Sequence, residues 1–147
     1  MTLYTIGYEG IDIRLFLKAL KNSKISAVID VRKLAYSRKR DFCRNALAEK
    51  LARHRINYFA LSNLGTSKHL RDSLHETGNY KVFFREYRKF LRQNTHLLND
   101  IKDLIDNGHY VALLCFEKDN EKCHRKIIAE EVKRMNGNGL KIIPISC

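Results

Sequence analysis

The chain has 147 residues, of which 44% are hydrophobic and 30% charged, and its net charge is +12. This predicts one globular domain over residues 1–147 and excludes a membrane span, because no apolar run approaches the ~20 residues that a bilayer requires. The first ten residues, MTLYTIGYEG, lack the basic and then apolar pattern of a signal peptide, and the four cysteines lack paired short spacings. We therefore expect a reduced, cytoplasmic protein with no membrane partner.

The positive charge is concentrated in two segments. Residues 32–55 hold nine basic residues against two acidic ones, a net charge of +7, and residues 81–92 hold five against one, a net charge of +4. Such clusters are typical of proteins that bind a polyanion, above all nucleic acid. The alternative is a solvated basic surface that only keeps the protein in solution. The predicted nucleic-acid contacts lie in the first segment: Arg38, Lys39, Arg40 and Arg44.

Strands and helices are predicted to alternate in the first half of the chain. Residues 2–7 predict a strand that ends at a glycine, and Asp12 is placed to cap the helix that follows. Residues 25–31 predict a second, buried strand. Apolar residues at every fourth position then predict a helix over about residues 41–54, and residues 56–61 predict a third strand.

The second half begins with residues 62–79, where two glycines and weak periodicity predict a long loop, often a functional feature. Apolar spacing predicts the later elements: helices marked by residues 83–91, 97–105 and 123–135, and strands at residues 110–115 and 140–145. The last strand contains Pro144, which cannot donate a ladder hydrogen bond, so this strand is expected at an edge of the sheet. The alternation predicts a single-domain α/β three-layer sandwich: a mostly parallel sheet of about five strands with helices on both faces.

The candidate site follows the apolar strand predicted at residues 110–115. The polar loop at residues 117–122 should lie at the carboxyl edge of the sheet, where α/β proteins bind ligands. Cys123, His124 and Arg125 then occupy the first turn of the predicted helix. Unpaired N–H groups and the positive end of the helix dipole favour an anion at such a turn.

Three residues at this edge are candidates for proton transfer: Asp30, Glu117 and His124. Each also has a purely structural explanation. Asp30 can simply pair with Arg32, Glu117 can be a solvated loop residue, and His124 can be an ordinary surface histidine. Arg32 and Arg125 offer guanidinium forks suited to phosphate, so we predict that they hold one anionic group between them.

The cysteines suggest further chemistry, but the spacing argues against it. Cys115 ends a strand, as in phosphatases and rhodaneses, yet those enzymes need an arginine six residues later and position 121 is Glu. Cys123 would gain a lowered pKa at a helix start, although a small buried residue is the explanation that we favour. With His124 the two cysteines can bind zinc, but no second ligand pair has the usual spacing. No metal or other cofactor is therefore predicted, a divalent metal is left open, and thiol chemistry is not expected to be the mechanism.

Short motifs extend over most of the chain: Thr5-Ile6-Gly7-Tyr8-Glu9-Gly10, Asp30-Val31-Arg32 with Ser37 and Phe42, Leu64-Gly65, Leu114-Cys115-Phe116-Glu117 and Cys123-His124-Arg125. In these motifs the chain resembles the bacterial and archaeal family known as domain of unknown function 488. It departs from the family at Ala35, where proline is usual, and at Thr66, where glycine is frequent. The resemblance implies an α/β fold whose motifs converge on one pocket, which adds Tyr8, Ser37 and Cys123 to the substrate-binding candidates. It implies no reaction.

Charge and site together predict an intracellular enzyme that acts on a nucleic acid or nucleotide, most simply a hydrolase at a phosphate or glycosidic bond. One alternative is a non-catalytic nucleic-acid-binding module in which the same residues only grip phosphate. Another is an enzyme for a small phosphate or sulfur compound, which requires the basic excess to be incidental. The sequence leaves the substrate and the oligomeric state open.

Overall fold

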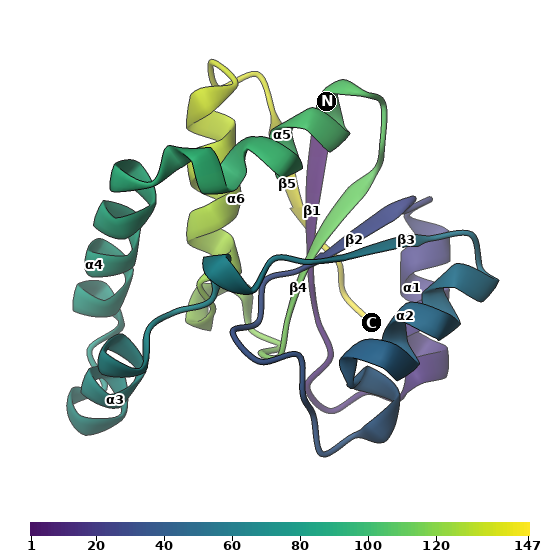
Figure 1. The fold of residues 1–147 in the computed structure, drawn as a ribbon, viewed down its shortest axis with the longest axis horizontal. Coiled ribbons are helices and arrows are strands. Elements are labelled where there is room, and N and C mark those ends of the chain that lie inside the picture. Colours follow the sequence, from purple (N-terminus) through teal and green to yellow (C-terminus); the bar gives the residue numbers. More distant parts are fainter.

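A computed structural model describes all 147 residues and confirms the α/β prediction (Figure 1). All five strands are parallel and form one sheet in the order β3-β2-β4-β1-β5. Their bounds are β1 (Thr2–Gly7), β2 (Ala27–Asp30), β3 (Asn57–Ala60), β4 (Val111–Cys115) and β5 (Lys141–Pro144). β5 lies at one edge, as Pro144 predicts, and β4 is the central strand.

Six helices surround the sheet: α1 (Ile13–Asn22), α2 (Arg44–Arg53), α3 (Lys68–Thr77), α4 (Tyr80–Gln93), α5 (Asn99–Asp106) and α6 (Arg125–Met135). α1 and α2 cover one face, on the right in Figure 1, while α4, α5 and α6 cover the other and α3 packs against α4. The longest helix, α4, has 14 residues, whereas ~20 are needed to cross a bilayer. None of the six can therefore span a membrane.

The sheet separates two hydrophobic cores because successive side chains of a strand point to opposite faces. In β4, Leu113 packs with residues of α4, α5 and α6, whereas Leu114 packs with residues of α1 and α2. All five residues of β4 are buried, as its continuous apolar run predicts. Each large apolar side chain buried in this way contributes about 1.5–3 kcal/mol. The cores therefore fix β4, and with it the start of the loop that carries Glu117.

Two predicted helix starts can be compared with the structure. Asp12 caps α1, since its side chain accepts a hydrogen bond of 2.9 Å from the backbone N–H of Leu15. The last helix was expected to begin at Cys123, but α6 begins at Arg125. Cys123 instead has an extended backbone and ends a short 3-10 turn over Asn120–Lys122. The thiol therefore precedes the helix.

Residues 62–79 are not the loop that weak periodicity predicts, because α3 occupies most of them. The side chain of Ser67 caps its first turn by accepting from the N–H of Leu70 at 3.2 Å, and Gly78 ends it in the left-handed conformation. No residue of α3 is fully buried, so the helix has no strong apolar stripe for a periodicity argument to detect. The capping residues Ser67 and Gly78 therefore mark where α3 begins and ends.

Part of the second basic segment is used inside the protein. Arg88 and Arg92 of α4 both bind Glu131 of α6, at 3.0 and 2.8 Å, and Arg134 approaches the same carboxylate at 3.4 Å. The side chain of Glu131 is only 2% exposed. Hydrogen bonds to these arginines outweigh burial, which alone would raise its pKa, and the net effect is a lowered pKa for Glu131. Arg88 and Arg92 thus join α4 to α6.

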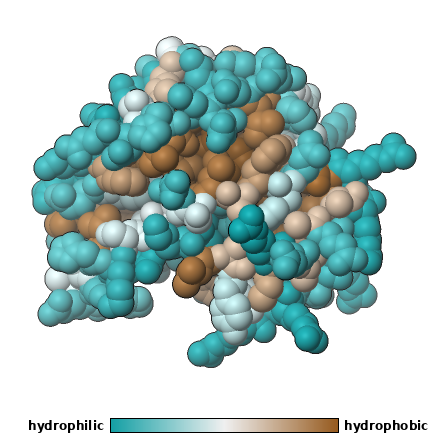
Figure 2. All heavy atoms as spheres, viewed as in Figure 1, coloured by the Kyte–Doolittle hydropathy of each residue, from teal (hydrophilic) through white to brown (hydrophobic).

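Hydrophobic residues also reach the surface, where Figure 2 shows them as a band between hydrophilic margins. A hollow of about 320 Å³ is lined by Phe59 and Leu61, in and after the edge strand β3, and by Leu104 of α5. Phe59 is 39% exposed. None of the candidate site residues lines this hollow.

Candidate functional site

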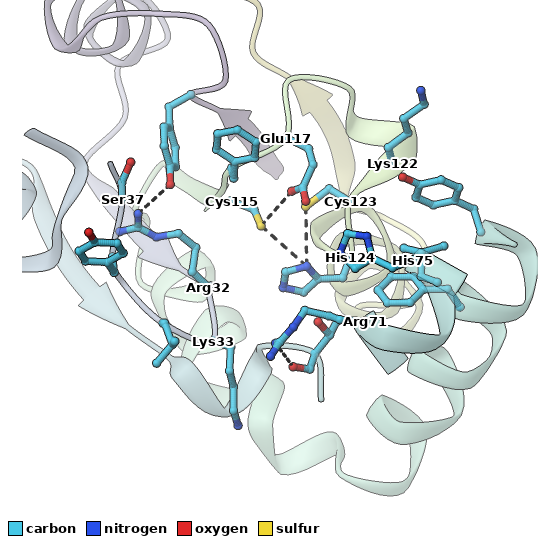
Figure 3. Close-up of a pocket in the computed structure, with 18 of the residues that line it drawn as sticks. Arg32, Lys33, Ser37, Arg71, His75, Cys115, Glu117, Lys122, Cys123 and His124 are labelled. Carbon is cyan, nitrogen blue, oxygen red and sulfur yellow. Dashed lines mark hydrogen bonds between the residues drawn. The ribbon is translucent and has the colours of Figure 1, made fainter. Parts of the chain in front are cut away.

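The largest hollow, which we call the main hollow, has a volume of about 760 Å³ and lies at the carboxyl edge of the sheet. Tyr8 comes directly after β1, Arg32 lies two residues after β2 and Cys115 ends β4, so the carboxyl ends of three adjacent strands meet at this hollow. α3 and α4 supply another wall, which includes Arg71 and His75 (Figure 3). This is the edge at which the sequence places the candidate site.

Cys115, Glu117, Cys123 and His124 meet in the centre of the main hollow (Figure 3). Nδ1 of His124 lies 3.8 Å from Sγ of Cys115 and 3.7 Å from Sγ of Cys123. Sγ of Cys115 also donates to Oε2 of Glu117 at 3.3 Å. The end of β4 and the start of α6 therefore bring two thiols, an imidazole and a carboxylate together.

The orientation of His124 is fixed by its other ring nitrogen. Nε2 lies 2.9 Å from the carbonyl oxygen of Val31, and because a carbonyl only accepts, Nε2 must carry the proton. The lone pair of the neutral ring is therefore on Nδ1, which faces the two sulfurs. Burial opposes a charge on this ring, but hydrogen bonds to Cys123 and Val31 and the nearby Glu117 carboxylate outweigh it and raise the pKa of His124.

The pKa of the Cys123 thiol is shifted in the direction opposite to the one that a helix start would give. A helix start would lower its pKa, yet burial and the neighbouring thiol of Cys115 raise the pKa of Cys123 well above its ordinary value of 9.0. The physical reason is that Cys123 is 1% exposed and precedes α6 rather than opening it. As a bare thiol it is a weak nucleophile. All four cysteines are free.

Asp30 is 0% exposed and does not line the main hollow. Its carboxylate accepts from Nε and Nη2 of Arg32, at 2.8 and 2.6 Å, and from the hydroxyl of Tyr58 at 2.5 Å. Burial and this hydrogen bond to Asp30 raise the pKa of Tyr58. Arg32 does line the hollow, and its Nη1 donates to the hydroxyl of Tyr8 at 3.0 Å. In this arrangement Asp30 positions Arg32.

Arg125 lies apart from Arg32, so the structure does not place in one hollow the two arginines that are expected to hold one anion. It lines a separate hollow of about 190 Å³ together with Thr5 and Glu9, and it is absent from the lining of the main hollow. The only hydrogen bond of its side chain, at 3.4 Å, runs from Nη2 to the carbonyl oxygen of Lys118, while Nε and Nη1 are buried without a partner. Because Arg125 begins α6, the helix directs its side chain past the end of β1.

The remaining predicted residues divide between the main hollow and the surface. Tyr8 and Ser37 line the main hollow, and so do Arg38 and Lys39. The ammonium of Lys39 also donates to the carbonyl of Tyr8 at 3.2 Å, so this lysine helps to hold the loop. Arg40 lines a smaller hollow beside α1, and Arg44 is exposed in the first turn of α2.

Sequence reasoning missed several lining residues: Lys33, Thr66, Arg71, His75, Tyr80, Phe83 and Lys122. Arg71 and His75 belong to α3, whose residues the sequence predicts as a loop. Their spacing of four residues places them on one face of a helix and was the available signal. Arg71 is held by a hydrogen bond of 2.6 Å from Nη1 to the carbonyl oxygen of Thr66.

Gly7 allows the backbone after β4 to approach the end of β1. A Cβ on Gly7 would overlap the carbonyl oxygen of Glu117 and lie 3.2 Å from Nη2 of Arg125. We expect Gly7→Ala to displace Glu117 and to lower the free energy of unfolding by about 1–3 kcal/mol, measured by chemical denaturation. Gly139→Ala is the control, because a Cβ there meets only the carbonyl oxygen of Asn136 at 3.8 Å. Equal losses in the two variants would contradict this account.

The fold and the main hollow define an α/β protein with a ligand-sized pocket at the carboxyl edge of a parallel sheet. Residues 12–132 match the family described as Domain of unknown function DUF488. Because this match covers most of the chain, the protein belongs to that family. No curated protein and no solved structure matches the chain.

Proposed function

We propose that the protein is an enzyme that hydrolyses a phosphate or glycosidic bond in a nucleic acid or a nucleotide. The observation that supports this proposal is the combination, in one hollow, of basic side chains, aromatic side chains and a half-buried carboxylate beside an imidazole. Basic side chains can bind a phosphate, aromatic side chains can stack on a base, and a carboxylate beside an imidazole can transfer a proton. The proposal does not depend on a shared site for Arg32 and Arg125.

The basic residues suit the sugar-phosphate part of such a substrate. Lys33, Arg38 and Lys122 are exposed, line the main hollow and form no ion pair within the chain. Free cations at a rim attract phosphates and release their counterions, which makes binding strongly dependent on salt. The hydroxyl of Tyr8 and the guanidinium of Arg32 are already fixed by each other and by Asp30, so they present a rigid polar wall.

The aromatic residues suit a base. Tyr36 is 72% exposed and Phe116 is 44% exposed, and both line the main hollow. Tyr80 and Phe83 of α4 line it from the other side. Aromatic faces that stay accessible beside basic side chains bind unpaired bases by stacking, at about 1–3 kcal/mol per base. A nucleotide or an unpaired end of a nucleic acid fits this arrangement better than a paired duplex.

Glu117 is the residue best placed to move a proton. It lines the main hollow and is half-buried, whereas Asp30 is fully buried and already accepts hydrogen bonds from Arg32 and Tyr58. A carboxylate that takes a proton from water and returns it to a leaving group is the minimum that hydrolysis requires. His124 lies beside it with the lone pair of Nδ1 directed at the two sulfurs.

The test measures turnover and binding separately. Purified protein is incubated with single-stranded DNA, double-stranded DNA, RNA and free nucleotides, and cleavage is followed by chromatography while binding is followed by anisotropy at rising salt. The variant pair Arg38→Glu with Lys122→Glu should weaken binding and flatten its salt dependence by about two charges. The control pair, Lys18→Glu with Lys21→Glu, changes the net charge equally at exposed residues that lie outside both basic segments and do not line the main hollow.

Four outcomes can be distinguished. The enzyme proposal is supported if at least one substrate is cleaved and if Arg38→Glu with Lys122→Glu weakens binding while the control pair does not. Binding without any cleavage removes the enzyme and leaves a nucleic-acid-binding module. Absence of both at low salt removes the nucleic-acid proposal, and equal weakening by the control pair removes the main hollow as the binding site.

A further inference from the structure

We propose that Cys115, Cys123 and His124 bind one zinc ion at the floor of the main hollow, with a fourth coordination position open to water. The three donor atoms are the two Sγ atoms and Nδ1 of His124, and all lie within 4.8 Å of one another. All three residues are buried. Two thiolates and one imidazole form a donor set that zinc enzymes use when they keep one position free.

The spacing of the donor atoms fits a single ion. Zinc lies about 2.3 Å from sulfur and about 2.0–2.1 Å from nitrogen, so donors that share a tetrahedral zinc are about 3.5 Å apart. The distances from Nδ1 of His124 to Cys115 and Cys123 are 3.8 and 3.7 Å. The two sulfurs lie within 4.8 Å of each other, so they would approach by up to about 1 Å when both bind the ion, whereas each is already near its bonding distance from Nδ1.

The imidazole is already oriented for a metal. Metal-binding histidines usually donate their other ring N–H to a carbonyl or a carboxylate, which directs the lone pair at the ion. Nε2 of His124 makes this bond to the carbonyl oxygen of Val31 at 2.9 Å. The ring also packs edge-on against Tyr87, at 5.3 Å between centroids. Its plane is thus held from two sides.

Charge favours zinc at this depth. Two bare thiolates would be costly in a buried position, but two thiolates and one Zn²⁺ together are neutral. A buried pair of thiols beside an unprotonated imidazole nitrogen is otherwise held only by hydrogen bonds to sulfur, which are weak. The soft donors favour zinc over magnesium or calcium, which prefer oxygen.

Glu117 lies next to the three proposed zinc ligands but is not one of them. Its Oε2 is 3.3 Å from Sγ of Cys115, within reach of a water molecule on the zinc. A carboxylate that does not bind the metal but exchanges protons with the metal-bound water accompanies a Cys-Cys-His zinc site in the nucleobase deaminases. Here the water would lose one proton to Glu117, and the hydroxide would attack the phosphorus or glycosidic carbon. The bond to the leaving group would then break with its electron pair, and the leaving group would take the proton from Glu117.

Binding of the ion does not depend on the proposed function, whereas its use in hydrolysis rests on it. Metal binding is therefore tested without turnover. Reduced protein is reconstituted with zinc, dialysed and analysed for metal, and cobalt is then substituted to give the absorption of a tetrahedral thiolate site. We expect one zinc per chain in the wild type and in the controls Cys43→Ser and Cys147→Ser. We expect at least a tenfold weaker affinity in Cys115→Ser and in Cys123→Ser.

A second measurement covers the case in which a serine variant fails to fold. The rate of alkylation of each thiol in the wild-type protein is measured by peptide mass, with and without zinc. Selective protection of Cys115 and Cys123 supports the site, and equal rates with and without zinc overturn it. The proposal is also overturned if reduced protein takes up neither zinc nor cobalt, if Cys43→Ser removes the metal, or if the two buried cysteines are recovered as a disulfide that excludes cobalt. Each outcome is independent of nucleic-acid binding.

Discussion

Asp30→Asn should lower the free energy of unfolding by about 3–5 kcal/mol, because it leaves the guanidinium of Arg32 buried without its counter-ion. Arg32 is 6% exposed and Asp30 is 0% exposed. The lost carboxylate also accepts hydrogen bonds from the backbone N–H of Arg32 at 3.1 Å and from the hydroxyl of Tyr58. Chemical denaturation followed by circular dichroism measures the change.

The matched control is Glu49→Gln, which breaks the ion pair between Glu49 and Arg53. Both of these side chains are 66% exposed, so the pair is screened by water and the change should stay below about 1 kcal/mol. An Asp30→Asn protein that unfolds at the wild-type denaturant concentration, yet has lost turnover, would show that Asp30 acts in the chemistry. The structural role assigned here would then be wrong.

Glu117→Gln should lower turnover by about 10²–10⁴-fold with little change in stability, because it removes a proton carrier and no buried ion pair. The amide keeps the shape of the side chain but cannot accept the proton of an attacking water. Substrate affinity should persist, since the basic and aromatic residues of the main hollow are unchanged. Single-turnover kinetics and binding by anisotropy separate the two effects.

Glu121→Gln provides the comparison for this second substitution. Glu121 belongs to the same loop, is exposed and pairs with Lys126. Glu121 does not line the main hollow, so the turnover of the Glu121→Gln variant should match that of the wild type. If Glu117→Gln and Glu121→Gln retain equal activity on a cleaved substrate, Glu117 does not transfer the proton.

The sequence is sufficient to predict the fold class because buried parallel strands have a simple pattern. The run Val111–Cys115 is apolar at every position, which predicts burial on both faces without any knowledge of its neighbours. The order β3-β2-β4-β1-β5 was not predicted, since it depends on pairing between strands that are distant in the sequence. α3 escaped prediction because it buries no residue fully and is defined by Ser67 and Gly78 at its ends.

The site was predictable in location but not in detail. Strand ends and a helix start were expected at one edge, and Cys115, Glu117 and His124 do line one hollow there. The partners of each side chain depend on directions that spacing does not encode. Arg125 faces a different hollow from Arg32, although the two residues follow adjacent strands. The closeness of Cys115 to Cys123 results from the path of the loop between them.

α3 forms a wall of the main hollow while contributing no fully buried residue of its own. Its side chains Arg71, Leu74 and His75 face the hollow, and its ends depend on two caps at the surface. Segments with so few buried contacts open by local unfolding at a small fraction of the global cost. The amide protons of α3 should therefore exchange with solvent well before those of β4. Local unfolding of α3 would therefore remove one wall of the main hollow while the sheet stays folded.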